Sequence, residues 1–184
     1  MFRKVAIAAL LLLGTSLTAA AEVVPERKTL QVVNDVTTQV RRYTRFTIFD
    51  DVNVRVGQNG EATLTGAVTM PFKKDDIGRI VSQVAGVSSV DNQLAVLPVS
   101  PYDDELRFRI ARAIYNNTAF WHYAAMPNPP IHIVVQNGRV TLTGVVQNNV
   151  DRMLARSLAT TFGAFSVKND LKTDAEMKDL LEKL

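Results

Sequence analysis

The amino-acid sequence has no cysteine and only two histidines among its 184 residues. Without cysteine the chain can form no disulfide, thiolate zinc site or thiol nucleophile. It also has no glycine-rich phosphate loop. Three adjacent acidic pairs lie near expected element ends and are interpreted as helix caps and solvated turns: Asp50-Asp51, Asp75-Asp76 and Asp103-Asp104. Because an enzyme needs a nucleophile with a base, paired carboxylates or a metal set, the sequence predicts a protein that is not an enzyme. We expect neither a metal site nor a cofactor.

Long apolar runs are also missing, apart from a short one at the N-terminus. Arg3 and Lys4 precede an apolar stretch over 5–17, and small residues follow at 19–21. This order is typical of a secretory signal peptide, residues 1–21, cleaved after Ala21, and it predicts a periplasmic protein. An uncleaved anchor is the alternative, but the stretch is shorter than the about 20 residues that span a bilayer.

Neither sign of charge is in excess once that segment is set aside. Removing Arg3 and Lys4 from the 21 Lys and Arg residues leaves 19, against 18 Asp and Glu, so the net charge is about +1. A nearly neutral domain lacks the basic surface that binds nucleic acid. We therefore expect no nucleic-acid partner.

What the sequence does contain is an internal repeat. The segment Ala-Thr-Leu-Thr-Gly-Ala-Val at 62–68 returns as Val-Thr-Leu-Thr-Gly-Val-Val at 140–146. Each copy follows an Asn-Gly pair, at 59–60 and 137–138, and each pair follows a run of alternating apolar residues. Alternation on both sides of Asn-Gly predicts a β-hairpin, because both residues tolerate the positive φ of a tight turn. Two such hairpins indicate a duplicated chain.

The hairpins lie in two units with the same order of elements. The first unit is expected to contain a helix at 29–43, the hairpin, a helix at 73–85 and a strand at 89–97. The second is expected to contain a helix at 103–116 capped by Asp103, a hairpin at 131–146, a helix at 149–162 and a strand through Val167 and Leu171. The predicted fold class is α+β, with two tandem α-β-β-α-β units, each a two-layer sandwich of two helices on a three-stranded sheet.

The predicted boundaries follow from a linker and a tail. Pro98 and Pro101 bracket a short linker, so unit one covers 22–98 and unit two 99–173. Residues 174–184 are expected to form an extra amphipathic helix that opens with a capping box and packs on one of the units.

The two units resemble the BON domain, the bacterial osmotically-induced and nodulation module. The resemblance rests on the leading helix, the hairpin ending in Thr-Leu-Thr-Gly, the second helix and Gly-Val-Ser-Ser-Val-Asp-Asn-Gln-Leu at 86–94. The second copy of that segment, at 163–171, has Ala164 where the family usually has Val. The resemblance implies a non-enzymatic module of the cell envelope, associated with phospholipid membranes or envelope proteins and with osmotic stress.

Repeated glycine and asparagine residues are expected to be structural. A crossing helix is expected to pack on Gly66 and Gly144, because glycine inside a strand costs stability unless something approaches closely. Gly86 and Gly163 are interpreted as helix C-caps. Asn92 and Asn169 are interpreted as side chains that bond local backbone at the start of a strand.

The leading helix of unit two has a second apolar face that its counterpart lacks. This face, opposite the core stripe, carries Phe108, Ala111 and Tyr115. The equivalent positions of unit one are polar: Asn34, Thr37 and Arg41. Arg109 and Arg112 lie beside the second face, and aromatic residues beside arginines are typical of contacts with an anionic membrane or a protein. The alternative is that this face packs against unit one.

A longer loop in unit two adds Trp121 and Tyr123, side chains that favour interfaces that are half apolar and half wet. The alternative for Trp121 is that it closes the core, and His132 is expected to face solvent. The sequence thus predicts a contact surface made of Phe108, Arg109, Arg112, Tyr115, Trp121 and Tyr123. Its expected partner is anionic phospholipid, or alternatively an envelope protein bound in a chaperone-like or scaffold role.

Overall fold

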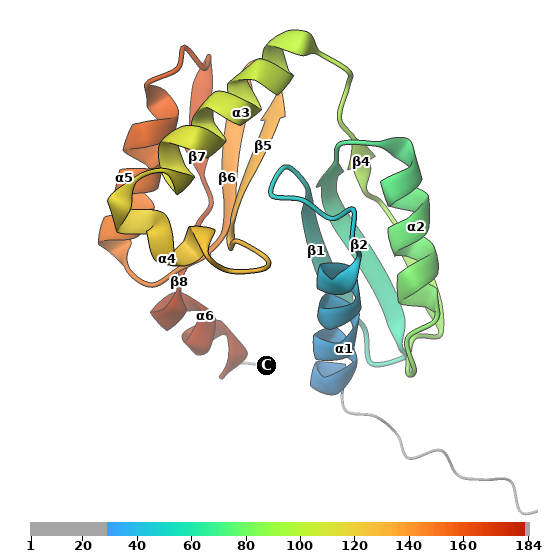
Figure 1. Ribbon diagram of the computed structural model, residues 1–184. Helices are drawn as coiled ribbons and strands as arrows, with labels where there is room; N and C mark the ends of the chain where they lie inside the picture. The colour runs from blue at the N-terminus through green and yellow to red at the C-terminus, as the bar shows by residue number, and fades with distance from the viewer. Residues whose placement is uncertain (1–28, 183–184) are drawn as a thin grey trace, which may run out of the picture.

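The computed structural model describes residues 29–182, so the predicted signal peptide lies outside the described residues. The chain forms two units side by side, each with helices covering one face of a small sheet (Figure 1). The α+β fold class with two tandem units is therefore confirmed.

Unit one contains α1 (Thr29–Arg42), β1 (Asp51–Val56), β2 (Glu61–Val68), α2 (Pro71–Ser82), β3 (Ser89–Asn92) and β4 (Ala95–Val96). Strand β2 is central: β1 pairs with it antiparallel, and β3 and β4 pair with it parallel. The expected single strand at 89–97 is broken in two, because Leu94 turns its side chain into the core and is only 1% exposed. The side chain of Asn92 accepts a hydrogen bond from the Leu94 amide at this break.

Unit two repeats the arrangement and extends it. It contains α3 (Pro101–Tyr115), η1 (Thr118–Phe120), α4 (Trp121–Ala124), β5 (Ile131–Gln136), β6 (Arg139–Val146), α5 (Asn149–Thr160), β7 (Ser166–Asn169), β8 (Lys172–Thr173) and α6 (Asp174–Leu181). Strand β6 is central, in the same way as β2. The capping box of α6 forms as expected, between Thr173 and Glu176. Arg152 of α5 contacts Glu176 at 2.9 Å and holds α6 at the end of the unit.

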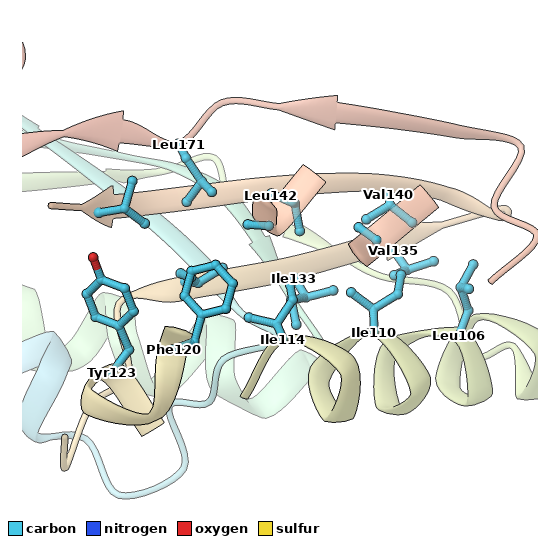
Figure 2. Close-up of a cluster of buried hydrophobic side chains, with 14 residues drawn as sticks. Leu106, Ile110, Ile114, Phe120, Tyr123, Ile133, Val135, Val140, Leu142 and Leu171 are labelled. Carbon is cyan, nitrogen blue, oxygen red and sulfur yellow. The ribbon is translucent and has the colours of Figure 1, made fainter. Parts of the chain in front are cut away.

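Each unit has its own apolar core. In α1 the buried apolar residues are Val32, Val36 and Val40, and in α3 they are Leu106, Ile110 and Ile114, the spacing of an amphipathic helix. Figure 2 shows the α3 side chains pointing towards Ile133, Val135 and Leu142 of the sheet, with Phe120 and Tyr123 closing one end. Burying one such side chain contributes about 1.5–3 kcal/mol.

The second hairpin has the tight turn that its sequence predicts. Asn137 and Gly138 have φ of 52° and 71°, which is the type I′ pattern. Asp103 is not a helix cap as expected, because Ser100 caps α3. The Asp103 carboxylate is fully buried and accepts hydrogen bonds from the amides of Gly138 (2.7 Å) and Asn137 (2.8 Å), so it ties the start of α3 to the turn.

The strand glycines are required for a different reason from the one expected. Gly66 and Gly144 have φ of 115° and 113°, a region that side chains rarely adopt. A Cβ at Gly144 would lie 1.8 Å from the carbonyl oxygen of Pro130, and one at Gly66 would lie 2.3 Å from that of Asp51. The neighbour is therefore the backbone at the start of the hairpin's own first strand, and the expected crossing helix is wrong.

The repeated asparagines bond to local backbone, as expected, and also to a helix. The Oδ1 atoms accept from the amides of Leu94 and Leu171, while the Nδ2 atoms of Asn92 and Asn169 donate to the carbonyls of Lys74 and Arg152. They lie at a strand end, and each ties its sheet to the second helix of its unit. Gly86 is not the C-cap of α2, which is Gln83, but it takes a positive φ in the turn that follows. Gly163 likewise follows Thr161, the C-cap of α5.

Candidate functional site

A short segment of unit one, Phe46–Asp51, lies along the outer edge of β5 in unit two. The carbonyl of Ile48 accepts a hydrogen bond from the Ile133 amide at 2.7 Å. Ile48 and Phe49 also pack against the core of unit two. The two units are therefore joined by one backbone hydrogen bond, from the turn at Ile48 and Phe49, as well as by side chains.

Asp50 anchors this segment within unit one. Its carboxylate is completely buried and lies 2.6 Å from Nζ of Lys73, which is itself 5% exposed. It also accepts hydrogen bonds from the backbone and side chains of Thr47 and Thr69. Burial alone would raise the pKa of Asp50, but these bonds outweigh burial and hold its pKa below the usual value. The expectation of a solvated turn is wrong for this residue, because five donors replace water around it.

His132 meets the same segment from the side of unit two. Its Nδ1 lies 2.6 Å from the carbonyl oxygen of Asp50, and its ring centroid lies 5.3 Å from that of Phe46. The expected solvent-facing position is wrong, because the pleat directs this side chain towards unit one. Burial lowers the pKa of His132 below its ordinary value, against the opposing effect of the Asp50 carbonyl and the Asp51 charge.

The second apolar face of α3 turns towards unit one. Phe108 makes an edge-to-face contact with Phe49 at 5.2 Å between ring centroids, although 52% of it stays exposed. The hydroxyl of Tyr115 donates to the carbonyl of Ile131 and accepts from its amide. Burial raises the pKa of the Tyr115 phenol. Packing against unit one, the alternative for this face, is therefore observed for Phe108, whereas Tyr115 is bonded to Ile131 within unit two.

The remaining predicted contact residues are divided between surface and core. Arg109 and Arg112 are exposed, and Arg109 pairs with Glu105 on the same helix. Trp121 on α4 is 72% exposed. Tyr123 is only 2% exposed, so its predicted place on a contact surface is wrong.

Tyr123 is buried because its hydroxyl has partners in the interior. It donates to the Asp151 carboxylate and accepts from the Gln147 amide, so it links α4 to the start of α5. Burial, with the nearby Asp151, raises the pKa of the Tyr123 phenol to about 12. The surface that the sequence predicts as one patch is thus split into an inter-unit contact, two exposed arginines and an exposed Trp121.

Two large apolar residues of α5 face outward, although apolar residues of an amphipathic helix are expected to face the core. Val150 and Met153 are 72% and 65% exposed, whereas Ala155 and Ala159 are completely buried. The alanine spacing of four could have identified the buried face, but the larger side chains give the stronger apolar signal. Small residues face inward here because α5 lies close to the sheet and to α3.

Trp121, Val150 and Met153 lie at one end of unit two, which we name the unit-two tip. The Tyr123–Asp151 hydrogen bond holds α4 beside the first turn of α5, and Figure 1 shows α4, the start of α5 and α6 gathered at this end. Arg112 lies in the last turn of α3, which leads into this end of the unit. The tip thus combines exposed apolar side chains with a nearby cation.

The described residues provide neither a metal-binding cluster nor a spanning helix. Within 29–182 no three His, Asp or Glu side chains come together in a way that could hold a metal ion. Over the same residues no helix has both the length and the apolar character needed to cross a bilayer.

Comparison with known proteins agrees with this architecture. The model of the BON domain matches residues 31–98 and 102–175. Two solved structures align with 15% sequence identity: the C-terminal domain of CdsD, described as the structural protein of the type III secretion system of Chlamydia trachomatis, and a second structure of CdsD. They cover 80% and 84% of this chain and 99% of their own, with TM-scores of 0.31 and 0.30. No curated protein matches the chain significantly. With both units matched by the same domain model over most of the sequence, the chain belongs to the BON-domain family.

Proposed function

We propose that this protein is a non-enzymatic binding protein of the periplasm, which associates peripherally with anionic phospholipid membranes through the unit-two tip. The observation that carries the proposal is the exposure of Trp121, Val150 and Met153 at one end of the unit. Exposed apolar side chains gathered in one place are uncommon on soluble monomers and mark interaction sites.

The chemistry of the tip fits the boundary of a lipid bilayer. A tryptophan ring has an apolar body and one N–H donor, so it favours the level of the lipid headgroups. Val150 and Met153 are one helical turn apart and project from the same side of α5. Arg112 and Arg156 are exposed and can face anionic headgroups, each contributing on the order of 1 kcal/mol near the surface.

Vesicle flotation of the chain from residue 22 onward tests this function. The protein should float with vesicles that contain phosphatidylglycerol and remain at the bottom with pure phosphatidylcholine. Trp121→Ala, and separately Val150→Ser with Met153→Ser, should weaken binding by roughly tenfold or more, as expected for anchor side chains. All three residues are exposed, so melting temperatures should stay close to that of the wild type.

Phe108→Ala is the matched control, because this aromatic residue lies against unit one instead of at the tip. It should leave flotation unchanged. Loss of flotation in Phe108→Ala with none in Trp121→Ala would contradict the proposed tip. Absence of flotation of the wild type with phosphatidylglycerol would reject lipid binding and favour an envelope protein as the partner.

A further inference from the structure

The outer edge of β5 is covered along its length. Its outward-facing backbone groups belong to Ile131, Ile133 and Val135, and each residue has at least one of these groups bonded from outside the sheet. Tyr115 bonds the amide and carbonyl of Ile131, Ile48 bonds the amide of Ile133, and Arg107 bonds the carbonyl of Val135. An edge strand without such covers presents unpaired amides and carbonyls to other chains. The edge of β5 is therefore largely blocked, in part by the turn of unit one that contains Ile48.

The equivalent edge in unit one is β1, and the groups that bond the edge backbone of β5 have no counterparts there. The strand pairings match Val52, Val54 and Val56 with Ile131, Ile133 and Val135. On the leading helix, Arg41 replaces Tyr115 and Val33 replaces Arg107. Among residues 29–182, no hydrogen bond from a side chain or loop reaches the backbone of these three valines.

A cleft of about 280 Å³ lies along this open edge. Unit one lines it with Val40 and Arg41 of α1 and with 51–54 of β1, and unit two lines it with Met126, 128–130, His132, Gly144 and Val145. Apolar side chains predominate among these, and the Arg41 guanidinium is exposed with no acidic partner in the described chain. The cleft thus offers an unpaired strand edge, largely apolar walls and the Arg41 cation. The one carboxylate in its lining, that of Asp51, already accepts hydrogen bonds from Asn53 and Thr143.

We propose that β1 binds an extended peptide segment of a partner protein by strand addition, with an acidic side chain of the peptide directed to Arg41. Main-chain hydrogen bonds to Val52 and Val54 would supply affinity, and the walls of the cleft would select alternate side chains. On the equivalent edge of unit two, the turn at Ile48 accepts one such hydrogen bond, from the Ile133 amide. A peptide strand beside β1 would repeat that bond at alternate residues.

The surroundings of β1 favour a single strand over a second folded copy. Pro129 and Pro130 of unit two stand opposite Val52 across the cleft, so the edge is flanked on that side by folded chain. A peptide strand needs only the about 4.8 Å spacing of a sheet to lie beside β1. Pairing of two β1 strands would instead bring a whole second molecule up to Pro129 and Pro130.

Nuclear magnetic resonance titration of the chain from residue 22 onward tests the proposal without lipid, so its result does not depend on the proposed membrane association. The probe is a short, terminally blocked peptide that alternates valine and threonine and carries one glutamate. Addition to millimolar concentration should shift the amide signals of 52–56 and slow their hydrogen exchange. The Ile133 amide should already exchange slowly in the free protein.

Variants and modified peptides identify the contact. Val54→Pro removes an amide that points away from the sheet, a position where proline is tolerated, and should weaken binding by roughly tenfold or more. Val54→Ile is the matched control and should bind normally. If Val54→Pro does not fold, N-methylated peptides test strand addition instead. Methylating the alternate amides on the peptide edge that pairs with β1 should abolish binding. Methylating the amides on the opposite edge should not.

The role of the Arg41 charge is tested by reversing it. Arg41→Glu should weaken binding of the glutamate peptide and strengthen binding of the same peptide with lysine in its place. Shifts confined to residues outside 37–56 and 126–145, or equal binding of both N-methylated peptides, would overturn strand addition. Dimerisation of the free protein that Val54→Pro abolishes would identify a second copy as the occupant and would also overturn the proposal.

Discussion

The carbonyl oxygen of Asp50 accepts a hydrogen bond from Nδ1 of His132 across the two units, while the carboxylate of the same Asp50 is buried in unit one. The inter-unit contact is therefore built on the most heavily bonded side chain of unit one. A change at either residue affects both the stability of a unit and the way in which the units meet.

The stability of the protein should fall as the pH drops below about 6.5, the ordinary pKa of histidine. Burial lowers the pKa of folded His132, so the unfolded chain binds a proton at a higher pH than the folded chain does. The contribution of neutral His132 to the free energy of unfolding is fully present above the pKa of the unfolded chain, and it is lost as the pH falls towards the pKa of the folded chain. Urea unfolding at pH 7.5 and 5.5 measures this difference. His132→Asn keeps an N–H donor but cannot titrate, and it should reduce the difference.

Asp50→Ala should lower the free energy of unfolding by about 3–5 kcal/mol, because it leaves the Lys73 ammonium buried and unpaired. Adding Lys73→Met should restore part of that loss. The control is Glu105→Ala, which breaks the exposed pair with Arg109 and should cost less than about 1 kcal/mol. Similar losses for Asp50→Ala and Glu105→Ala in urea unfolding would show that the buried pair does not stabilise unit one.

A double-mutant cycle between Phe49 and Phe108 should give a coupling energy of about 0.5–1.5 kcal/mol, the range for edge-to-face aromatic pairs. Phe49→Ala combined with Trp121→Ala is the matched control and should be additive, because Trp121 makes no ring contact with Phe49 among the described residues. Additivity of both cycles in urea unfolding would mean that the aromatic contact does not persist in solution.

Gly144→Ala should destabilise the protein much more than Gly163→Ala. Both glycines have positive φ, which costs an L residue about 1–2 kcal/mol. At Gly144 the added Cβ would also meet the Pro130 carbonyl, whereas at Gly163 nothing lies within 4 Å. Thermal unfolding of the two variants should therefore show a clearly lower melting temperature for Gly144→Ala. Equal melting temperatures would contradict the close approach.

Unit two, expressed as residues 99–184, should fold by itself, because it has a complete core of its own. It should nevertheless lose the Ile48 contact, so the Ile133 amide should exchange faster with solvent than in the full chain. The amide of Leu142, on the central strand, serves as the control and should keep its protection. An unchanged exchange rate at Ile133 would show that unit one does not cover this edge in solution.

Local periodicity was enough to predict most of the fold. The helix predicted at 29–43 and the turn at Asn137-Gly138 depend on neighbours a few residues away, and both formed as expected. The roles of Asp50 and Asp103 could not be found in this way, because their partners Lys73 and Gly138 lie 23 and 35 positions along the chain. Carboxylates beside turns are usually solvated, and only tertiary packing buries these two.

The candidate site was harder to predict, because a second apolar face does not reveal what covers it. Phe108 and Tyr115 stood out against the polar residues of unit one, yet their contacts are Phe49 and Ile131. Val150 and Met153 were missed because the closeness of α5 to the sheet selects small residues, so Ala155 and Ala159 take the inner positions. Comparing the two units showed the positions at which they differ, but not which of the residues at those positions are exposed.

The contact of Ile48 with Ile133 also bears on how the protein avoids aggregation while it is made. A chain that emerges amino end first completes unit one before β5 appears, and domains generally fold as units in that order. The segment Phe46–Asp51 can therefore already be in place, fixed by Asp50 and Lys73, when the unpaired edge of β5 emerges. Exchanging the order of the two units in the gene would remove this advantage and leave the Ile133 amide of β5 uncovered until unit one had followed.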